Sequence, residues 1–310
     1  MVKNYLSIDI GGTNVKYGLL DRAGHIIEKH RIKTPTDGLA SFQREIRAII
    51  QSYRGAIRGI AFSVPGRVDT KTGTVYHGGS LPFLDGVNFR SLFETEDQIP
   101  IAVENDGKSA ALAELWLGNL QNIHSGVAIV LGTGVGGGII IDGKLHYGTH
   151  LQAGEFSFIS EDYRQDSYMN GAVGFTLSAV NMIQTIGKTL RLENPQDGRL
   201  IFDYINRRDP RAWPIFQQYC DHLAKLVLSL QAVLDVDRYV IGGGISAQPI
   251  VTKTLRISMD QLLQNNPLIK DSLEPIDIEP AKFANDANLF GALYSFLVQV
   301  DEGDIEAAVS

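Results

Sequence analysis

Three consecutive polar residues, Glu104, Asn105 and Asp106, separate an apolar segment from an alanine-rich one in the sequence VENDGKSAALAE. An aspartate at the start of a helix is most often a cap, because its carboxylate accepts hydrogen bonds from the first backbone N–H groups. A carboxylate beside an amide also suits the vicinal hydroxyls of a sugar, and it can accept the proton of an attacking hydroxyl. Asp106 is therefore a candidate helix cap and a candidate general base.

A glycine-rich turn follows the first apolar segment, in the sequence DIGGTNVK from Asp9 to Lys16. Gly11 and Gly12 permit backbone angles that other residues avoid, so successive N–H groups can converge on an anion. Thr13 adds a hydroxyl donor, Lys16 a positive charge, and Asp9 a carboxylate suited to Mg²⁺, directly or through water. Taken alone, the pattern fits a tight hairpin as well as it fits a phosphate site.

A second glycine-rich turn, LGTGVGGG from Leu131 to Gly138, carries five glycines in eight residues. Glycine loses the most conformational entropy on folding, so this number indicates close approach of the backbone to a ligand. The turn includes Thr133 and Gly134, which resemble the Gly-Thr pair of the first turn. The Walker A pattern and the dinucleotide-binding GxGxxG pattern are both absent from the sequence. We therefore expect two glycine–threonine hairpins that face each other and hold phosphates.

A third glycine cluster, VIGGGIS, ends another apolar segment. Ligands of open α/β sheets bind at the carboxyl ends of the strands. We interpret Gly243 and Gly244 as a contact to the base or ribose of a nucleotide. A plain turn into a helix is the alternative.

The elements that position these turns form an internal repeat. Residues 5–26 and 126–147 each consist of an apolar strand, a Gly-Thr turn, a second strand and a turn with Asp and Gly. Apolar residues at helical spacing predict helices over 38–54, 172–187, 212–235 and 285–300, and an alanine-rich helix that begins near residue 106. The alternation predicts an α/β protein with two domains built on one plan. Two unrelated hairpins are the alternative.

We expect these domains to comprise residues 1–118 with 286–300, and residues 119–285. Residues 301–310 form a short acidic end that we expect to be a mobile tail. No low-complexity segment separates the halves, so a hinge made of element ends is expected rather than a tether.

Composition excludes several classes of function. The chain has 310 residues and a net charge of −7, so a nucleic-acid partner is not expected, because phosphate binding needs a basic surface. The single cysteine, Cys220, excludes an internal disulfide and a cysteine-rich zinc site, which fits a reducing cytosol. There is no signal-peptide pattern and no run of roughly 18 apolar residues, so we expect a cytoplasmic protein without a membrane partner.

Taken together, the motifs resemble those of the ROK sugar kinases. DIGGTNVK, VPGRVD, ENDGKSAALAE, GTGVGGGII, AGEFSF and GGGIS occur in the order and spacing of that family, over nearly the whole chain. The resemblance implies a two-domain actin-like, hexokinase-like fold with duplicated β-sheet domains around a cleft. It also implies ATP-dependent phosphorylation of a hexose, or of a hexose-containing glycoside, at the primary 6-hydroxyl. A fructokinase or an N-acetylhexosamine kinase stays open as an alternative, and a homodimer is compatible with the family.

The resemblance also implies a role for particular residues. Asp106 is similar to the general base, and it contributes to sugar binding together with Gly66, Asn105 and Glu155. The residues similar to the ATP site are Gly11, Gly12, Thr13, Lys16, Thr133, Gly134, Gly243 and Gly244, and Asp9 is similar to the Mg²⁺ ligand.

The chain departs from the family pattern after Glu155. The family's commonest form continues with Gly-His and a later cysteine cluster that binds zinc, whereas Ser157 and Phe158 stand here and no zinc site is expected. A second acidic sugar ligand is also missing, since no Asp or Glu lies between Asp166 and Glu193. We hypothesise that Phe158 lines a more open, apolar site that accepts a glycoside. The alternative is a hydrophobic plug that replaces the zinc as a structural staple.

Two other classes of function are weighed against a kinase. ROK repressors carry an added N-terminal DNA-binding domain, whereas the first phosphate turn begins here at Asp9 and the charge is acidic. A non-catalytic sugar sensor would not need both phosphate turns and Asp106. We expect Lys108 to be a solvated helix residue, and Trp116 and Trp213 to be packing residues.

Overall fold

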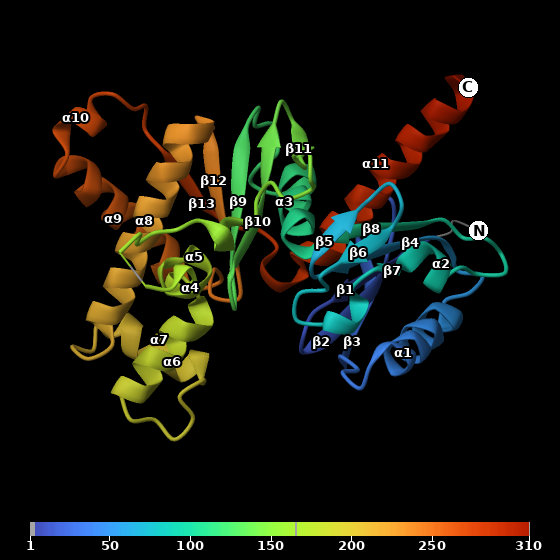
Figure 1. Cartoon of the computed structure of the whole chain (residues 1–310), viewed down its shortest axis with the longest axis horizontal. Helices are drawn as coiled ribbons and strands as arrows, with labels where there is room; N and C mark the ends of the chain where they lie inside the picture. The colour runs from blue at the N-terminus through green and yellow to red at the C-terminus, as the bar shows by residue number, and fades with distance from the viewer. Residues whose placement is uncertain (1–3, 165, 310) are drawn as a thin grey trace. The chain divides into compact units, whose positions relative to one another are not determined.

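The structure is a computed structural model that describes residues 4–164 and 166–309, the last nine of them by their backbone alone (Figure 1). Its contacts divide the chain into two compact units. Unit 1 comprises Met1–Leu117, Tyr147–Ala153 and Asp286–Ser310, and unit 2 comprises Gly118–His146 and Gly154–Asn285. The segment Tyr147–Ala153, which lies inside the predicted residues 119–285, therefore groups with unit 1.

Unit 1 contains a mixed five-stranded sheet of order β3-β2-β1-β4-β8. Its strands are β1 (Asn4–Ile10), β2 (Asn14–Leu20), β3 (Ile26–Lys33), β4 (Ile57–Val64) and β8 (Ile101–Asn105). The hairpin strands β1, β2 and β3 pair antiparallel, whereas β1, β4 and β8 run parallel. The carboxyl ends of the three parallel strands therefore meet at one edge, where open α/β sheets bind ligands.

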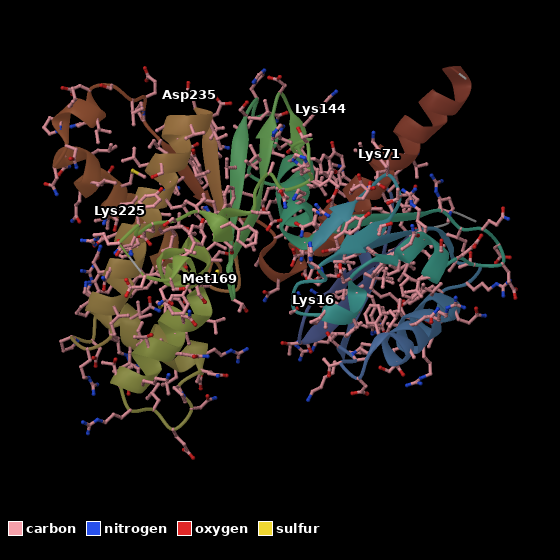
Figure 2. The ribbon with its side chains drawn as sticks, viewed as in Figure 1. Lys16, Lys71, Lys144, Met169, Lys225 and Asp235 are labelled. Atoms are coloured by element: carbon pink, nitrogen blue, oxygen red, sulfur yellow. The ribbon has the colours of Figure 1, made fainter. Side chains whose placement is uncertain are left out.

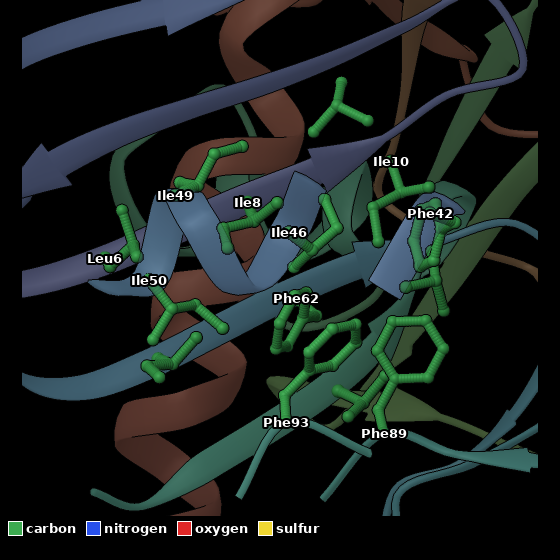
Figure 3. Close-up of a cluster of buried hydrophobic side chains, with 14 of the residues drawn as sticks. Leu6, Ile8, Ile10, Phe42, Ile46, Ile49, Ile50, Phe62, Phe89 and Phe93 are labelled. Atoms are coloured by element: carbon green, nitrogen blue, oxygen red, sulfur yellow. The ribbon is translucent and has the colours of Figure 1, made fainter. Parts of the chain in front are cut away.

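One face of this sheet packs against helix α1 (Leu39–Ser52) and the short helix α2 (Phe89–Leu92). Side chains alternate along a strand, so Leu6, Ile8 and Ile10 of β1 all point to this face. They belong to one buried cluster with the rings of Phe42, Phe62, Phe89 and Phe93 (Figure 3). The centroids of Phe62 and Phe93 lie 5.2 Å apart in a stacked arrangement. This core fixes the positions of the strand ends.

The other face packs against helix α11 (Ala287–Val309), which also contacts α3 (Asp106–Leu117). Tyr5, Ala102 and Phe296 belong to its apolar cluster. Towards the carboxyl ends of the strands, this face becomes polar. The register pairs Asp9 of β1 with Ser63 of β4, and Ser63 with Glu104 of β8. The three side chains form a buried polar row across three parallel strands.

The rest of unit 1 is small. Strands β5 (Arg67–Asp69), β6 (Thr74–Tyr76) and β7 (Val87–Asn88) form a three-stranded antiparallel sheet, and η1 (Pro82–Leu84) is a single 3-10 turn.

Unit 2 repeats the topology of the unit 1 sheet. Its strand order is β11-β10-β9-β12-β13, with β9 (Gly126–Leu131), β10 (Val135–Ile141), β11 (Lys144–His146), β12 (Arg238–Gly243) and β13 (Asp277–Pro280). As in unit 1, the hairpin strands pair antiparallel and the last two strands run parallel to the first. The two predicted phosphate turns therefore occupy the same position in each sheet, and the α/β class is confirmed.

Helices and 3-10 turns make up most of the remainder of unit 2. They are η2 (Phe156–Phe158), α4 (Tyr168–Gly171), α5 (Val173–Thr176), α6 (Ala179–Thr189), α7 (Gly198–Asn206), α8 (Trp213–Leu234), α9 (Pro249–Gln264), α10 (Pro267–Lys270) and η3 (Ala284–Asp286), the last at the boundary with unit 1. The predicted helix over 172–187 is divided into α5 and α6. Ser178 causes the division, because its hydroxyl accepts a hydrogen bond from Asn181 N–H at 3.1 Å and so caps α6.

An ion pair fastens the segment after η2 to helix α8. His222 Nδ1 lies 2.8 Å from Glu161 Oε1, and the Glu161 side chain is 17% exposed. Burial by itself raises the pKa of Glu161, but the hydrogen bonds from His222 and Thr176 and the charge of His222 bring that pKa below its ordinary value. The carboxylate is therefore the favoured form of Glu161 in the folded protein.

Helix α11 ends at Val309, so its backbone covers most of the predicted tail. The side chains of residues 301–309 and the whole of Ser310 lie outside the described part, and the mobility of the tail stays a prediction. Within residues 4–164 and 166–309, no helix has the length and apolar character needed to cross a membrane.

Candidate active site

The junction of β8 and α3 brings together three predicted sugar-site residues. Asn105 Oδ1 accepts a hydrogen bond from Lys108 N–H at 3.0 Å, so Asn105, and not Asp106, caps the helix. Asn105 Nδ2 donates to Gly66 O at 2.8 Å and to Asp106 Oδ1 at 2.9 Å. Gly107 N–H also donates to Asp106 Oδ1, at 2.8 Å. Two donors therefore fix the plane of the Asp106 carboxylate.

Gly66 must be glycine for structural reasons. Its φ is +94°, and a Cβ there would lie 2.8 Å from both Gly78 N and Tyr76 O. Its carbonyl reaches Asn105 only because the chain turns sharply after β4.

The first phosphate turn links β1 to β2. Gly11 N–H donates to Asn14 O at 3.0 Å, so this donor serves the turn itself. Thr34 N–H donates to Thr13 O at 3.0 Å, and the Thr34 hydroxyl donates to Gly11 O at 2.5 Å. These bonds hold the carbonyls of the turn against β3, whereas Gly12 and Thr13 are exposed. The donors for an anion are accordingly expected from Gly12 and Thr13.

Asp9 lies beside this turn and is buried, with only 5% of its surface exposed. Its Oδ1 accepts hydrogen bonds from Ser63 Oγ at 3.2 Å and Asn288 Nδ2 at 2.9 Å. Its Oδ2 lies 3.2 Å from Lys16 Nζ, which extends from β2 (Figure 2). Both oxygens thus have protein partners, so the geometry fits Mg²⁺ held through water better than Mg²⁺ bound directly. Among the described residues, no three His, Cys, Asp or Glu side chains converge as a metal site would require.

The second phosphate turn is joined to the turn that follows Glu155. Gly132 N–H donates to Gly134 O at 3.0 Å, and Thr133 is exposed at the tip. The Ser157 hydroxyl accepts from Val135 N–H at 2.9 Å and donates to Val135 O at 3.0 Å. A Cβ on Gly134 would lie 2.7 Å from Ser157 Oγ. The predicted phosphate turn and the predicted sugar ligand of unit 2 are therefore neighbours.

In the third glycine cluster, Gly243 and Gly244 differ in whether the fold requires glycine at the position. Gly243 has a φ of +95°, and a Cβ there would lie 2.6 Å from Leu131 N, so packing against β9 explains it. Gly244 is exposed, and a Cβ there would meet nothing within 4 Å. The fold therefore leaves Gly244 unexplained, which favours a ligand contact.

Phe158 and Glu155 are the two ends of one 3-10 turn. Phe158 N–H donates to Glu155 O at 3.1 Å, and this hydrogen bond closes the turn between the two residues. Phe158 is 61% exposed, whereas Phe156 is 3% exposed and fills the core. The Tyr168 hydroxyl donates to the carbonyl of Phe158. The plug interpretation is therefore wrong, because a plug must be buried.

The structure also bears on the predictions for Lys108 and for the two tryptophans. Lys108 is only 2% exposed, so the expectation of a solvated residue is wrong. Trp116 stacks on Tyr294 with centroids 5.4 Å apart, and Trp213 lies 5.7 Å from Phe216, which confirms their packing role.

Sequence reasoning missed the partners of Asp9. Ser63 and Asn288 are far from it in the chain and carry no motif. Only the pairing of β1 with β4, and the position of the first turn of α11, bring them to this carboxylate.

A comparison with protein families matches residues 5–299. The chain belongs to the ROK family. A β-glucoside kinase of Listeria innocua is 30% identical over 299 residues, which cover 94% of this chain and 96% of that protein. A glucokinase of Halalkalibacterium halodurans is 28% identical, covering 97% of each chain. The solved structure of a Streptococcus pneumoniae ROK protein in complex with sucrose matches with a TM-score of 0.86 and 26% identity, covering 96% of this chain and 99% of that one.

These three matches cover 94–97% of this chain. They confirm the predicted family, the actin-like fold and the enzyme class, an ATP-dependent sugar kinase.

Proposed function

We propose that this ROK protein transfers the γ-phosphoryl group of ATP to the 6-hydroxyl of a hexose or of a hexose-containing glycoside, with Asp106 as the general base. The observation that supports it most is the orientation of the Asp106 carboxylate by Asn105 Nδ2 and Gly107 N–H. Phosphoryl transfer depends mainly on positioning and on charge stabilisation, and the junction of β8 and α3 supplies the first of these.

Asp106 accepts the proton as the sugar hydroxyl attacks. A positioned base of this kind contributes roughly 10²–10⁴-fold to the rate. Asn105 is 6% exposed, and both N–H groups of its side-chain amide donate to protein oxygens, so we expect it to hold Asp106 in place. We also propose it as a sugar contact, as the resemblance implies. We propose Gly66 and Glu155 as further sugar ligands. The placement of Glu155 opposite Asp106 stays a prediction.

The nucleotide is expected at the glycine turns. We propose that the backbone N–H groups of the exposed residues Gly12, Thr13 and Thr133 bind phosphate oxygens and that Gly244 contacts the adenosine. When bound, ATP with Mg²⁺ supplies the phosphoryl group and part of the neutralising charge. Asp9 is the residue that we expect to orient that ion through water. The remaining candidates, Gly11, Lys16, Gly134 and Gly243, then shape or support these turns.

The acceptor class is inferred from the environment of Glu155. The 61%-exposed ring of Phe158, three residues after Glu155, can stack on the apolar face of a second sugar or of another aglycone. The likeness to a β-glucoside kinase supports this acceptor. We propose β-glucosides as substrates together with free glucose. A fructokinase or N-acetylhexosamine kinase stays the alternative, and we expect the reaction in the cytoplasm, with a homodimer as the expected assembly.

The direct test measures ADP release with ATP, Mg²⁺ and one sugar at a time: glucose, fructose, mannose, N-acetylglucosamine, N-acetylmannosamine or cellobiose. We expect turnover with glucose and cellobiose, and ³¹P and ¹H NMR of the product should place the phosphate on C6. ADP release with none of these sugars, or a product phosphorylated at C1, would refute the proposed function. If glucose is phosphorylated and cellobiose is not, only the proposal that the protein accepts a glycoside is refuted.

A further inference from the structure

The buried carboxylate of Glu104 has no part in the chemistry proposed above. It ends the polar row that runs from Asp9 through Ser63, and it is 1% exposed on the sheet face covered by α11. An ionised carboxylate costs several kcal/mol to bury unless donors and an opposite charge compensate it. Its presence one residue before Asn105 therefore calls for a physical reason.

Both carboxylate oxygens of Glu104 accept hydrogen bonds, which offset part of the cost of burying it. Its Oε1 accepts Asn105 N–H at 2.8 Å. Its Oε2 accepts the Tyr147 hydroxyl at 2.6 Å and the Ser295 hydroxyl at 3.1 Å. Burial holds the pKa of Glu104 above its ordinary value, although these hydrogen bonds and the charge of the buried Lys108 reduce the rise. One carboxylate thus joins β8, α11 and the residue Tyr147.

Tyr147 is the first residue of a loop that a backbone hydrogen bond closes. Its carbonyl accepts Ala153 N–H at 3.1 Å, and inside the loop Leu151 N–H donates to Gly148 O at 3.3 Å. The loop Tyr147–Ala153 groups with unit 1, although the residues on either side of it belong to unit 2. Two residues after Ala153 the chain reaches Glu155. Through its hydrogen bond to Glu104, the Tyr147 hydroxyl therefore connects β8, which ends at Asn105 just before Asp106, with the segment that leads to Glu155.

We infer that Glu104 and Tyr147 are positioning residues of the kinase, whose hydrogen bond fixes both the Asn105–Asp106 turn and the start of the loop that precedes Glu155. The inference rests on the proposed function, because the positions of Asp106 and Glu155 affect turnover only if these residues act on the sugar. Stability alone is a poor explanation, since buried charged groups are often replaceable by apolar ones without loss of stability. Apolar side chains could not supply one acceptor group that orients two separate segments of the chain, as Glu104 does.

The test uses two variants that remove one hydroxyl each from the same carboxylate oxygen. Tyr147→Phe removes the donor on the loop, and Ser295→Ala removes the donor on α11. We expect Tyr147→Phe to lower kcat about tenfold, with the KM for ATP within about twofold of wild type. Ser295→Ala should leave kcat within about twofold. Equal losses in both variants, or no loss in Tyr147→Phe, would overturn the inference.

A double-mutant cycle addresses the pair itself. If Glu104 and Tyr147 act as a unit, Tyr147→Phe should cost less than about twofold in kcat when made in Glu104→Met, which has no side-chain oxygen to accept the tyrosine hydroxyl. Independent, multiplicative losses would contradict the pairing.

Hydrogen–deuterium exchange separates this inference from the proposed function. Tyr147→Phe should accelerate amide exchange in residues 148–155 at least fivefold, and Ser295→Ala should not. This readout needs no sugar, so it decides the loop anchor even if the wild-type protein phosphorylates none of the sugars tested. Equal exchange in the two variants would overturn the inference.

Discussion

Asp106→Asn is expected to separate catalysis from folding in this ROK protein. The amide has nearly the shape of the carboxylate, and its oxygen can still accept the hydrogen bonds from Asn105 Nδ2 and Gly107 N–H that Asp106 Oδ1 accepts. What the variant loses is a negative charge in the first turn of α3 and the ability to take up a proton.

The two losses differ in size. A charge at a helix N-terminus contributes about 0.3–1 kcal/mol, so we expect the free energy of unfolding to fall by less than about 1 kcal/mol. Loss of a general base costs about 10²–10⁴-fold in kcat, or about 3–5 kcal/mol in the barrier at about 1.36 kcal/mol for each tenfold. The catalytic loss should therefore exceed the loss of stability several times over.

The assay is steady-state ADP release at saturating ATP and sugar, with urea unfolding and calorimetric sugar binding on the same preparations. Asp197→Asn is the matched control, because Asp197 also begins a helix, where its Oδ1 accepts Leu200 N–H at 3.1 Å. The control should keep kcat within about twofold, and Asp106→Asn should bind sugar with a Kd within about threefold of wild type. A kcat for Asp106→Asn within tenfold of wild type would remove Asp106 from the role of base.

Three further predictions concern unit 2. Gly244→Ala should unfold like wild type but raise the KM for ATP at least fivefold, whereas Gly243→Ala should lower the urea midpoint through strain at positive φ; an unchanged KM in the first variant would argue against the adenosine contact. Phe158→Ala should lower kcat/KM for cellobiose about tenfold and for glucose less than twofold, and equal losses would exclude an aglycone contact. Because the folded-state pKa of Glu161 is lowered, its pair with His222 stabilises the protein above the ordinary glutamate pKa of about 4.3, and this contribution disappears as the pH falls through the folded-state pKa. His222→Phe should therefore lower the free energy of unfolding by about 1 kcal/mol at pH 6 and by much less at pH 3, and a loss independent of pH would contradict the assignment.

Local sequence patterns were sufficient for the strands and turns that carry the candidate ATP residues. The two Gly-Thr turns occupy equivalent places in two sheets of one topology, as the internal repeat predicted. The helices over 39–52 and 213–234 also follow from apolar spacing. These features depend on residues close together in the chain.

What sequence could not provide depends on contacts between distant segments. The row from Asp9 through Ser63 to Glu104 exists only because β4 lies between β1 and β8 in register. Lys108 is buried because α3 is covered along nearly all of its first two turns, and an alanine-rich sequence gives no apolar stripe from which to infer this. The anchoring of Tyr147 by Glu104 likewise joins residues that no motif connects.

The Ser157 hydroxyl has a thermodynamic consequence for the two substrates. It bonds to both backbone groups of Val135, at the end of the second phosphate turn, from within the 3-10 turn that Glu155 begins. The two turns are therefore linked through a single side chain. By linkage, whatever factor the nucleotide imposes on the affinity for the sugar, the sugar imposes on the affinity for the nucleotide. If the two substrates bind at these turns as proposed, Ser157 is the side chain through which each would change the affinity for the other.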